Sequence, residues 1–221
     1  MDPLSVAVLA GGRSRRMGRD KASAPLGDAS LLDRVLDRVA GVGQETILVT
    51  ADAVDARPGV RNVVDEVPGR GGLGGIHAAL RAATYAHCLV VACDMPFLNR
   101  SLLRYMAEEP RDYDVLVPSL DAGRSDQGES ETLETLHAIY GRACLPTIER
   151  RLVAGSLKLA DLLDDLRVRR IPESVVHRYD PDLLSFFNAN TPDDLSWATE
   201  HLREFDARRA ARREAGRSDV A

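Results

Sequence analysis

A dense group of cationic side chains follows a short apolar segment near the beginning of the chain. Ser5–Leu9 (SVAVL) leads into residues 10–21 (AGGRSRRMGRDK), where five cations fall within nine residues: Arg13, Arg15, Arg16, Arg19 and Lys21. Gly11 and Gly12 allow a tight turn in which backbone N–H groups face an anion. Neither the phosphate-loop pattern G-x-x-x-x-G-K-[ST] nor the dinucleotide pattern G-x-G-x-x-G is present. Such a run can simply be a solvated face, but its place directly after an apolar strand favours a polyphosphate cradle.

A single carboxylate, Asp94, stands at a comparable position later in the chain. It follows the apolar run at residues 88–92 (CLVVA) and precedes Met95 and Pro96. Magnesium prefers hard oxygen ligands, usually one or two protein carboxylates together with phosphate oxygens and water. An aspartate here can also cap a helix or shape a turn. Together with the cationic loop, Asp94 predicts a site for a Mg²⁺–triphosphate.

A third polar segment, residues 65–75 (DEVPGRGGLGG), begins with Asp65 and is rich in glycine. Its glycines let the backbone pass close to a bulky ligand before a helix that we expect to begin at about Gly74. A flexible linker would have a similar composition. The neighbouring signals favour a third ligand-contacting loop.

Alternating apolar runs and helical patterns indicate the elements that position these loops. Strands are predicted at Ser5–Leu9, Val60–Val64 and residues 46–49, 88–92 and 115–117, and helices at Leu31–Val39 and residues 76–83 and 101–108. This alternation predicts an α/β fold of Rossmann type, with three layers and a mostly parallel sheet covered by helices on both faces. In such sheets ligands bind beyond the carboxyl ends of the strands, which is where the three loops fall.

The second half of the chain is less regular. Residues 121–134 (DAGRSDQGESETLE) are polar and predict a long surface loop. Further strands are expected at residues 135–140 and 168–171, and helices at residues 145–153 and 159–166. Thr191 and Pro192 mark the start of a helix that should end near Phe205. We expect residues 1–205 to form a single domain, and residues 206–221 a charged tail that is disordered or a frayed helix.

Composition narrows the class of protein. The formal net charge is −5, which argues against a nucleic-acid partner. The three cysteines, Cys88, Cys93 and Cys144, are scattered, so neither a disulfide framework nor a zinc site is predicted. No stretch is apolar and long enough for a signal or membrane helix, and we expect a cytoplasmic protein.

The motifs resemble those of the molybdenum cofactor guanylyltransferases, within the nucleotidyltransferases of GT-A-like Rossmann fold. Residues 9–21 (LAGGRSRRMGRDK) are similar to that family's L-A-G-G-x-S-x-R-M-G-x-D-K signature. Residues 65–75 resemble its D-(x)-G-P-L-x-G segment, residues 93–97 (CDMPF) its C-D-M-P strand end, and residues 188–195 (NANTPDDL) its N-x-N-T-P-E-D-L ending. The four motifs occur in the same order and span roughly residues 5–200.

The resemblance implies an activity, namely transfer of GMP from GTP to the phosphate of molybdopterin with release of pyrophosphate, dependent on Mg²⁺. It also implies roles for individual residues. Nucleotide contacts are implied for Leu9, Ala10, Gly11 and Asp65, neutralisation of the triphosphate for Arg16 and Lys21, metal binding for Asp94, and contacts with molybdopterin for Asn188 and Asn190. Proteins that supply the cofactor and molybdoenzymes that receive it are further candidate partners.

Several positions depart from the family pattern or add to it. Gly72 and Gly74 replace a proline and a small residue, which predicts a looser loop. Thr50 stands where relatives often offer an amide or acid to the base or ribose, and Asp52 is an alternative. Lys158 falls where relatives tend to carry a basic residue near the pterin. His77 and His137 are interpreted as structural residues.

Two other classes of function stay open at this point. The first is another nucleotidyltransferase of the same fold, either a cytidylyltransferase for the same cofactor or a sugar-phosphate enzyme. Cytidylyl relatives tend to carry D-x-D-T-P where this chain has Asn188 and Asn190. The second is a nucleotide-binding regulator without catalysis, against which Asp94 and Lys21 argue, because a pure binder needs no metal-holding acid beside the phosphates.

Overall fold

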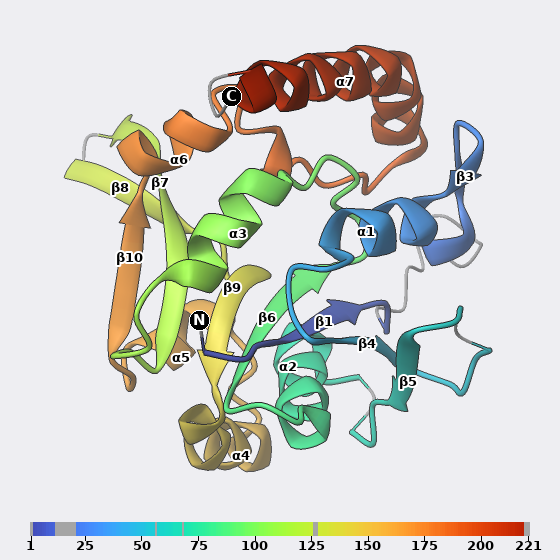
Figure 1. Ribbon diagram of the computed structural model, residues 1–221. Helices are drawn as coiled ribbons and strands as arrows, with labels where there is room; N and C mark the ends of the chain where they lie inside the picture. Colours follow the sequence, from blue (N-terminus) through green and yellow to red (C-terminus); the bar gives the residue numbers. More distant parts are fainter. Residues whose placement is uncertain (1, 12–20, 56, 68, 126–127, 219–221) are drawn as a thin grey trace.

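The computed structural model of the chain describes residues 2–11, 21–55, 57–67, 69–125 and 128–218. Within them, eight strands form one mixed sheet in the order β10-β7-β9-β6-β1-β4-β5, with β8 beside β7 (Figure 1). The strands are β1 (Ser5–Leu9), β4 (Glu45–Thr50), β5 (Val60–Val64), β6 (His87–Ala92), β7 (Val115–Ser125), β8 (Gly128–Leu133), β9 (His137–Gly141) and β10 (Val168–Pro172). Neighbours in the β6-β1-β4-β5 half are parallel, as are β7 and β10, whereas β8 and β9 run antiparallel to their neighbours.

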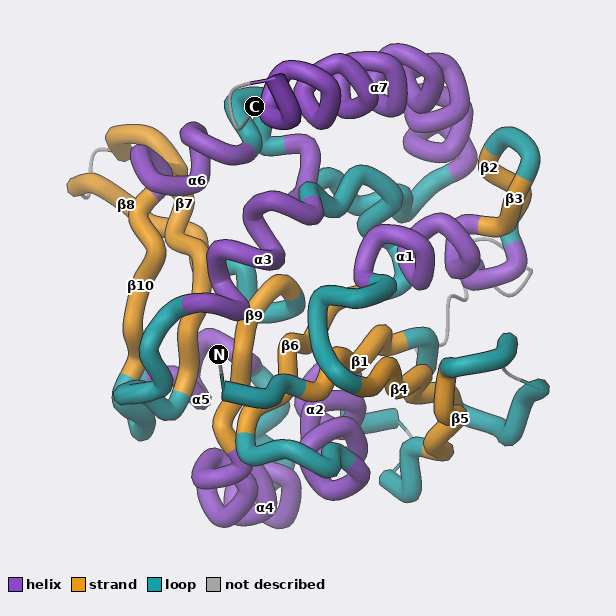
Figure 2. Tube along the Cα trace, in the orientation of Figure 1, coloured by secondary structure: helices purple, strands orange, loops and turns teal. Residues whose placement is uncertain are grey.

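Helices cover both faces of this sheet, which gives three layers (Figure 2). Helices α1 (Leu31–Val39), α3 (Arg100–Glu108) and α6 (Glu173–Tyr179) pack on one face through residues such as Val35, Leu102 and Val176. Helices α2 (Gly71–Ala82), α4 (Leu145–Ala154) and α5 (Leu159–Leu163) pack on the other, through residues such as Ile76 and Ile148. The predicted α/β, three-layer architecture is confirmed.

A third, smaller core lies under the last helix, α7 (Pro192–Ser218). Ala198 and Leu202 of α7 pack with Phe97, which follows β6, and with Leu26 of the hairpin formed by β2 (Pro25–Leu26) and β3 (Ala29–Ser30). No helix among the described residues has both the length and the apolar character needed to cross a membrane.

The polar segment at residues 121–134 was expected to be a loop, and this expectation is wrong. Strand β7 continues to Ser125 and pairs antiparallel with β8, from Ser119 opposite Leu133 to Ser125 opposite Gly128, with a register shift between Asp121 and Arg124. Pairing of strands depends on backbone hydrogen bonds and not on burial, so a solvent-exposed hairpin can be polar along its length.

Three helix boundaries also differ from the prediction by more than one residue. Helix α5 ends at Leu163, before the expected end at residue 166. Helix α2 begins at Gly71, earlier than the expected start near Gly74. Helix α7 continues to Ser218, beyond the expected end near Phe205. Residues 206–215 are almost entirely alanine, arginine and glutamate, which are strong helix formers, and no glycine interrupts them before Gly216.

Candidate active site

The carboxyl ends of β1, β4 and β6 meet at one edge of the sheet. Leu9 lies between Val49 and Ala92 in the strand register. The backbone pairing continues for one more residue on each side, because Ala10 N donates to Val49 O (2.8 Å) and Cys93 N donates to Leu9 O (3.0 Å). The loops that start with Ala10 and Cys93 therefore leave the sheet side by side, as the parallel arrangement predicts.

The first loop is described only at its two ends. Gly11 is exposed, and a Cβ atom built on it would lie 3.5 Å from the backbone nitrogen of Ala51, at ordinary contact distance. Lys21 begins the short 3₁₀ helix η1 (Lys21–Ser23), which packs against α1. Arg16 and the rest of residues 12–20 lie outside the described residues. The predicted roles of Arg16 and Lys21 toward phosphates stay predictions.

The third loop packs tightly against the first strand. A Cβ atom on Gly75 would lie 2.9 Å from Leu9 Cδ1, and one on Gly74 would lie 3.1 Å from Asp65 Oδ2. A Cβ atom on Gly72 would lie 2.9 Å from Leu159 Cδ1 and 3.3 Å from Leu136 Cδ2. The expectation of a looser loop at Gly72 and Gly74 is therefore wrong: these glycines are helical, and they allow close approach of their neighbours.

Asp65 and Thr50 both make hydrogen bonds inside the protein. Asp65 N donates to Thr50 O (2.8 Å), and Asp65 Oδ1 accepts from Val67 N (2.9 Å), which turns the chain toward α2. The buried Thr50 hydroxyl donates to Asp52 O (2.7 Å) and accepts from the Asn62 amide (2.7 Å). A nucleotide at this position would meet the exposed Asp52 and the backbone more readily than the Thr50 side chain.

Asp94 meets the asparagine segment at the end of β6. The backbone N–H of Ala189, between Asn188 and Asn190, donates to Asp94 O at 2.9 Å. The Asn188 amide donates to Phe186 O (3.0 Å), which holds this segment in a tight turn. The two motifs, almost a hundred residues apart in sequence, thus lie in direct contact at the edge where Leu9 ends its strand.

The turn after Asn190 is fixed by the helix start predicted at Thr191. Thr191 Oγ1 accepts from Asp194 N (3.1 Å), and Asp194 Oδ2 accepts from Thr191 N (2.8 Å) and from Asn190 N (2.8 Å). This reciprocal arrangement caps α7, with Pro192 at its first residue. The direction of the chain at Asn190 is therefore set by the helix cap.

A second set of contacts, not predicted from the sequence, joins Asn99 to Tyr179 and Ser185, a few residues from Asp94 and from Asn188. Asn99 caps α3 through Oδ1, donates its amide to Tyr179 O (2.7 Å), and donates its backbone N–H to Ser185 Oγ (3.0 Å). The buried Asp180 carboxylate accepts from Ser185 N (2.7 Å). An asparagine just before a helical pattern is a recognisable cap, but its long-range partners are not visible in the sequence.

Lys158 lies on the rim of this edge. Its side chain is 74% exposed, and its Nζ is 3.4 Å from Asp161 Oδ1. The next residue, Leu159, contacts Gly72 at the start of α2. The cation is thus free to turn toward a ligand at this rim, because an exposed i,i+3 ion pair is worth only ~0.5 kcal/mol.

Both histidines singled out from the sequence contact other parts of the fold, but only His137 is fully buried. His77 Nε2 lies 3.3 Å from Glu149 Oε1, between α2 and α4. His137 is fully buried against Phe186, with ring centroids 4.9 Å apart, and burial lowers its pKa to about 4. A neutral, enclosed imidazole fits the structural interpretation.

The residues at this edge suit a magnesium ion whose remaining ligands come from the phosphates of the substrate. Among the described residues no group of three or more His, Cys, Asp and Glu side chains is placed to hold a metal. The Asp94 carboxylate would supply one hard oxygen ligand, and the backbone oxygen of the same residue accepts from Ala189 N of segment 188–190. Magnesium is usually held by one or two protein carboxylates and by phosphate oxygens, so this set suits a metal–triphosphate complex and not a metal bound by protein alone.

Comparison with known proteins identifies relatives along almost the whole chain. The family model described as "MobA-like NTP transferase domain" matches residues 6–171. A molybdenum cofactor guanylyltransferase from Desulfosudis oleivorans is 37% identical, over 92% of this chain and 98% of the relative. A Pelotomaculum thermopropionicum protein named "Probable molybdenum cofactor guanylyltransferase" is 40% identical, over 85% of this chain and 88% of its own.

Solved structures agree with the sequence relatives. The molybdopterin-guanine dinucleotide biosynthesis protein A from Archaeoglobus fulgidus superposes with a TM-score of 0.77 at 33% identity, covering 90% of this chain and 99% of that one. A 2-C-methyl-D-erythritol 4-phosphate cytidylyltransferase from Thermus thermophilus has a TM-score of 0.67 over 89% of this chain and 98% of its own. At 15% identity the second likeness concerns the fold alone.

Proposed function

We propose that this chain, which belongs to the family of MobA-like NTP transferases and whose relatives include molybdenum cofactor guanylyltransferases, transfers GMP from GTP to the phosphate of molybdopterin. An oxygen of the molybdopterin phosphate attacks the α-phosphorus of GTP. The bond from that phosphorus to the bridging β-oxygen breaks, and pyrophosphate leaves with the electron pair. The product is the guanine dinucleotide form of the cofactor.

The observation that carries this proposal is the contact between residue 94 and residues 188–190 at the carboxyl edge of β1 and β6. A transferase must hold two phosphate-bearing substrates so that one oxygen lies in line with the bond to be broken. In this structure the carboxylate expected to serve the triphosphate and the amides expected to serve the acceptor belong to two touching segments. The two substrates would therefore meet over Asp94.

The roles of the individual residues follow from charge and position. Bound Mg²⁺ would neutralise charge on the phosphates and be held by Asp94. Arg16 and Lys21 would share that neutralisation, while Leu9, Ala10, Gly11 and Asp65 would position the nucleoside. No general base is required, because the attacking phosphate oxygen is already anionic. Cofactor synthesis of this kind fits a cytoplasmic protein.

The experiment that tests the proposal measures pyrophosphate release while GTP, Mg²⁺ and molybdopterin are omitted in turn. Release should require all three. Asp94→Ala should lower turnover by about a hundredfold or more, the scale expected when one transition-state stabiliser is removed. The contact with Ala189 should persist, because it uses the backbone oxygen of residue 94.

Asp112→Ala is the matched control. Asp112 is an exposed carboxylate whose partner is Arg169, and it precedes β7 at the opposite edge of the sheet. This variant should keep wild-type turnover. Turnover of the Asp94→Ala enzyme within about twofold of wild type would overturn the metal-binding role, and release without molybdopterin would indicate a hydrolase.

A further inference from the structure

A buried arginine of α1, Arg38, contacts both the last helix and the loop that carries Asp94. Only 7% of its side chain is exposed. Its Nη2 donates to Asp206 Oδ1 of α7 (2.6 Å), and its Cζ lies 4.9 Å from the centroid of the Phe205 ring. Its Nε donates to Pro96 O (3.4 Å), two residues after Asp94. Arg38 therefore joins α1 and α7 to the turn that follows β6.

That turn is held at two backbone carbonyls by donors from different parts of the chain. Asp94 O accepts from Ala189 N (2.9 Å), and Pro96 O accepts from Arg38 Nε. The two carbonyls flank Met95, so little of the backbone between them can rotate independently. Groups that fix the backbone of a metal ligand also fix the direction of its side chain, and metal affinity depends on such contacts.

The orientation of the guanidinium is itself fixed by a closed set of contacts. Phe97, next to Pro96, is fully buried and packs edge-on against Phe205, with ring centroids 5.0 Å apart. Phe205 and Asp206 are neighbours in α7, and both contact Arg38. The contacts thus lead from Arg38 through α7 and Phe97 back to Pro96, and the guanidinium is held on several sides.

Packing alone does not require an arginine at this position. Burial of a charge is costly, and replacement of a buried ion pair by apolar residues of similar volume is often neutral or stabilising. The Asp206 side chain is 43% exposed, so its carboxylate keeps contact with water. What an apolar side chain could not supply is an N–H donor for Pro96 O. The hydrogen bond to the loop therefore distinguishes Arg38 from a residue that only fills space.

We propose that Arg38 is a positioning residue for the metal site: oriented by Asp206, it fixes the Pro96 carbonyl and with it the turn that carries Asp94. The inference rests on the proposed function, in which Asp94 holds the Mg²⁺ of the GTP complex. It extends that function by giving α7 a part in metal binding through Asp206. Loss of Arg38 should weaken binding of Mg²⁺–GTP and leave binding of metal-free GTP nearly unchanged.

The test measures GTP binding by calorimetry, once with Mg²⁺ and once with EDTA. Arg38→Met keeps much of the side-chain volume and removes the donor. With Mg²⁺ its GTP affinity should fall about tenfold, the lower end of the range for residues that orient metal ligands. With EDTA its affinity should stay within twofold of wild type. Asp206→Ala should show the same split, and the double variant should lose no more than Arg38→Met, because both residues act through one contact.

Two controls accompany these variants. Arg57→Met removes an arginine that pairs with Asp37 of the same helix α1 (2.8 Å) at an exposed position, and it should bind GTP as wild type does. The chain's single tryptophan, Trp197, packs 5.9 Å from the Phe97 ring. Its emission spectrum should be unchanged in Arg38→Met if the core under α7 stays intact.

The outcomes separate this inference from the proposed function. If Mg²⁺ strengthens GTP binding equally in wild type and Arg38→Met, the role of Arg38 is wrong and guanylyl transfer stands. Equal losses of affinity with Mg²⁺ and with EDTA would also contradict it, because they would show a general effect on the fold. If Mg²⁺ does not strengthen GTP binding to wild type, the metal-binding role of Asp94 fails and this inference fails with it.

Discussion

At the scale of single residues, the segment that carries Asn188 and Asn190 contacts residue 94 through the backbone hydrogen bond from Ala189 N to Asp94 O. A carboxylate attracts a cation, whereas an amide offers both a donor and an acceptor without adding negative charge near a phosphate. This difference suits a division of labour in which Asp94 serves the metal and the two amides serve the acceptor. The division leads to an experiment that separates the two substrates.

Asn188→Asp and Asn190→Asp should weaken the use of molybdopterin by about tenfold or more, while GTP affinity changes only a few-fold. The added carboxylate would repel the acceptor phosphate, and one such repulsion of ~1.4 kcal/mol corresponds to a factor of ten. Titration with each ligand separately checks the result. Loss of GTP binding with intact pterin binding would place these residues on the nucleotide instead.

At the scale of elements, the sheet could be predicted from the sequence, and the site could be predicted only in part. Apolar runs such as Ser5–Leu9 identify buried strands directly, because both faces of a central strand are covered. The β7–β8 hairpin escaped prediction because its sequence does not alternate apolar and polar residues, the pattern that identifies a half-buried strand. The start of α2 escaped because glycines at 72, 74 and 75 serve close packing, which depends on distant residues such as Leu9 and Leu159.

Hydrogen bonds between residues far apart in the chain could not be predicted from the sequence either. The Ser185 hydroxyl accepts from Asn99 N, and the segment that carries Ser185 continues into Asn188. This hydrogen bond connects Asn99, which follows Asp94 in the chain, to the segment that precedes Asn188 and Asn190. We therefore interpret Ser185 as a positioning residue for the acceptor site.

Ser185→Ala should raise KM for molybdopterin several-fold and leave KM for GTP unchanged. It should also lower Tm by ~2–4 °C, because the partly buried Asn99 N–H loses its acceptor, at a cost of ~1 kcal/mol. Ser196→Ala is the control, since the exposed Ser196 hydroxyl only bonds Pro192 O within α7. Equal rises in both KM values would indicate a general loss of structure and not positioning of one substrate.

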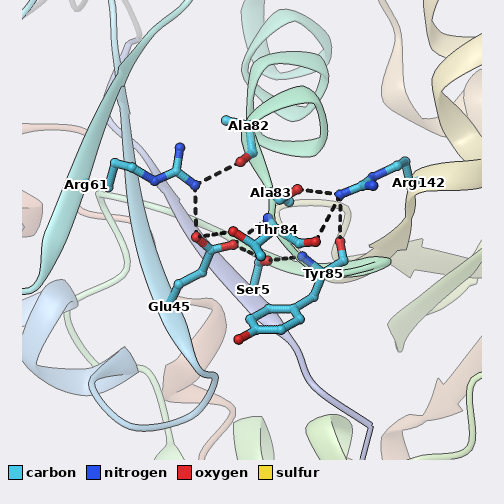
Figure 3. A network of polar contacts seen from close by, with 8 residues as sticks. All are labelled: Ser5, Glu45, Arg61, Ala82, Ala83, Thr84, Tyr85 and Arg142. Carbon is cyan, nitrogen blue, oxygen red and sulfur yellow. Dashed lines mark hydrogen bonds and ion pairs between the residues drawn. The ribbon is translucent and has the colours of Figure 1, made fainter.

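At the scale of the whole molecule, the two edges of the sheet differ in the residues that gather there. The carboxyl edge holds the candidate site, and the amino edge holds a polar network that ties strands to the end of α2 (Figure 3). Glu45, the first residue of β4, accepts from Ser5 Oγ (2.6 Å), Thr84 N (2.6 Å) and Arg61 (2.8 Å). Arg61 also donates to Ala82 O (2.8 Å), and Arg142 reaches the carbonyls that follow this helix.

This network predicts how stability depends on pH. Burial alone would raise the pKa of Glu45, but the hydrogen bonds from Ser5, Arg61 and Thr84 outweigh it and lower the pKa from 4.5 to about 2. The stabilisation is therefore complete above pH 4.5 and is lost as pH falls toward 2. When the pH is lowered from 4.5 to 2, the Tm of wild type should fall ~2–4 °C more than the Tm of Glu45→Gln. This figure is kept small because solvent screens the partly exposed Glu45 charge. Parallel pH curves for the two proteins would contradict the role of Glu45.

The measurement that bears most directly on guanylyl transfer follows the phosphate groups of GTP into the products. With molybdopterin and Mg²⁺ present, label in the α-phosphate should appear in a pterin dinucleotide, and label in the γ-phosphate should appear in pyrophosphate. CTP should replace GTP poorly. Retention of both labels in unreacted GTP, release of γ-label as inorganic phosphate, or a preference for CTP would each contradict the assignment of this chain as a molybdenum cofactor guanylyltransferase.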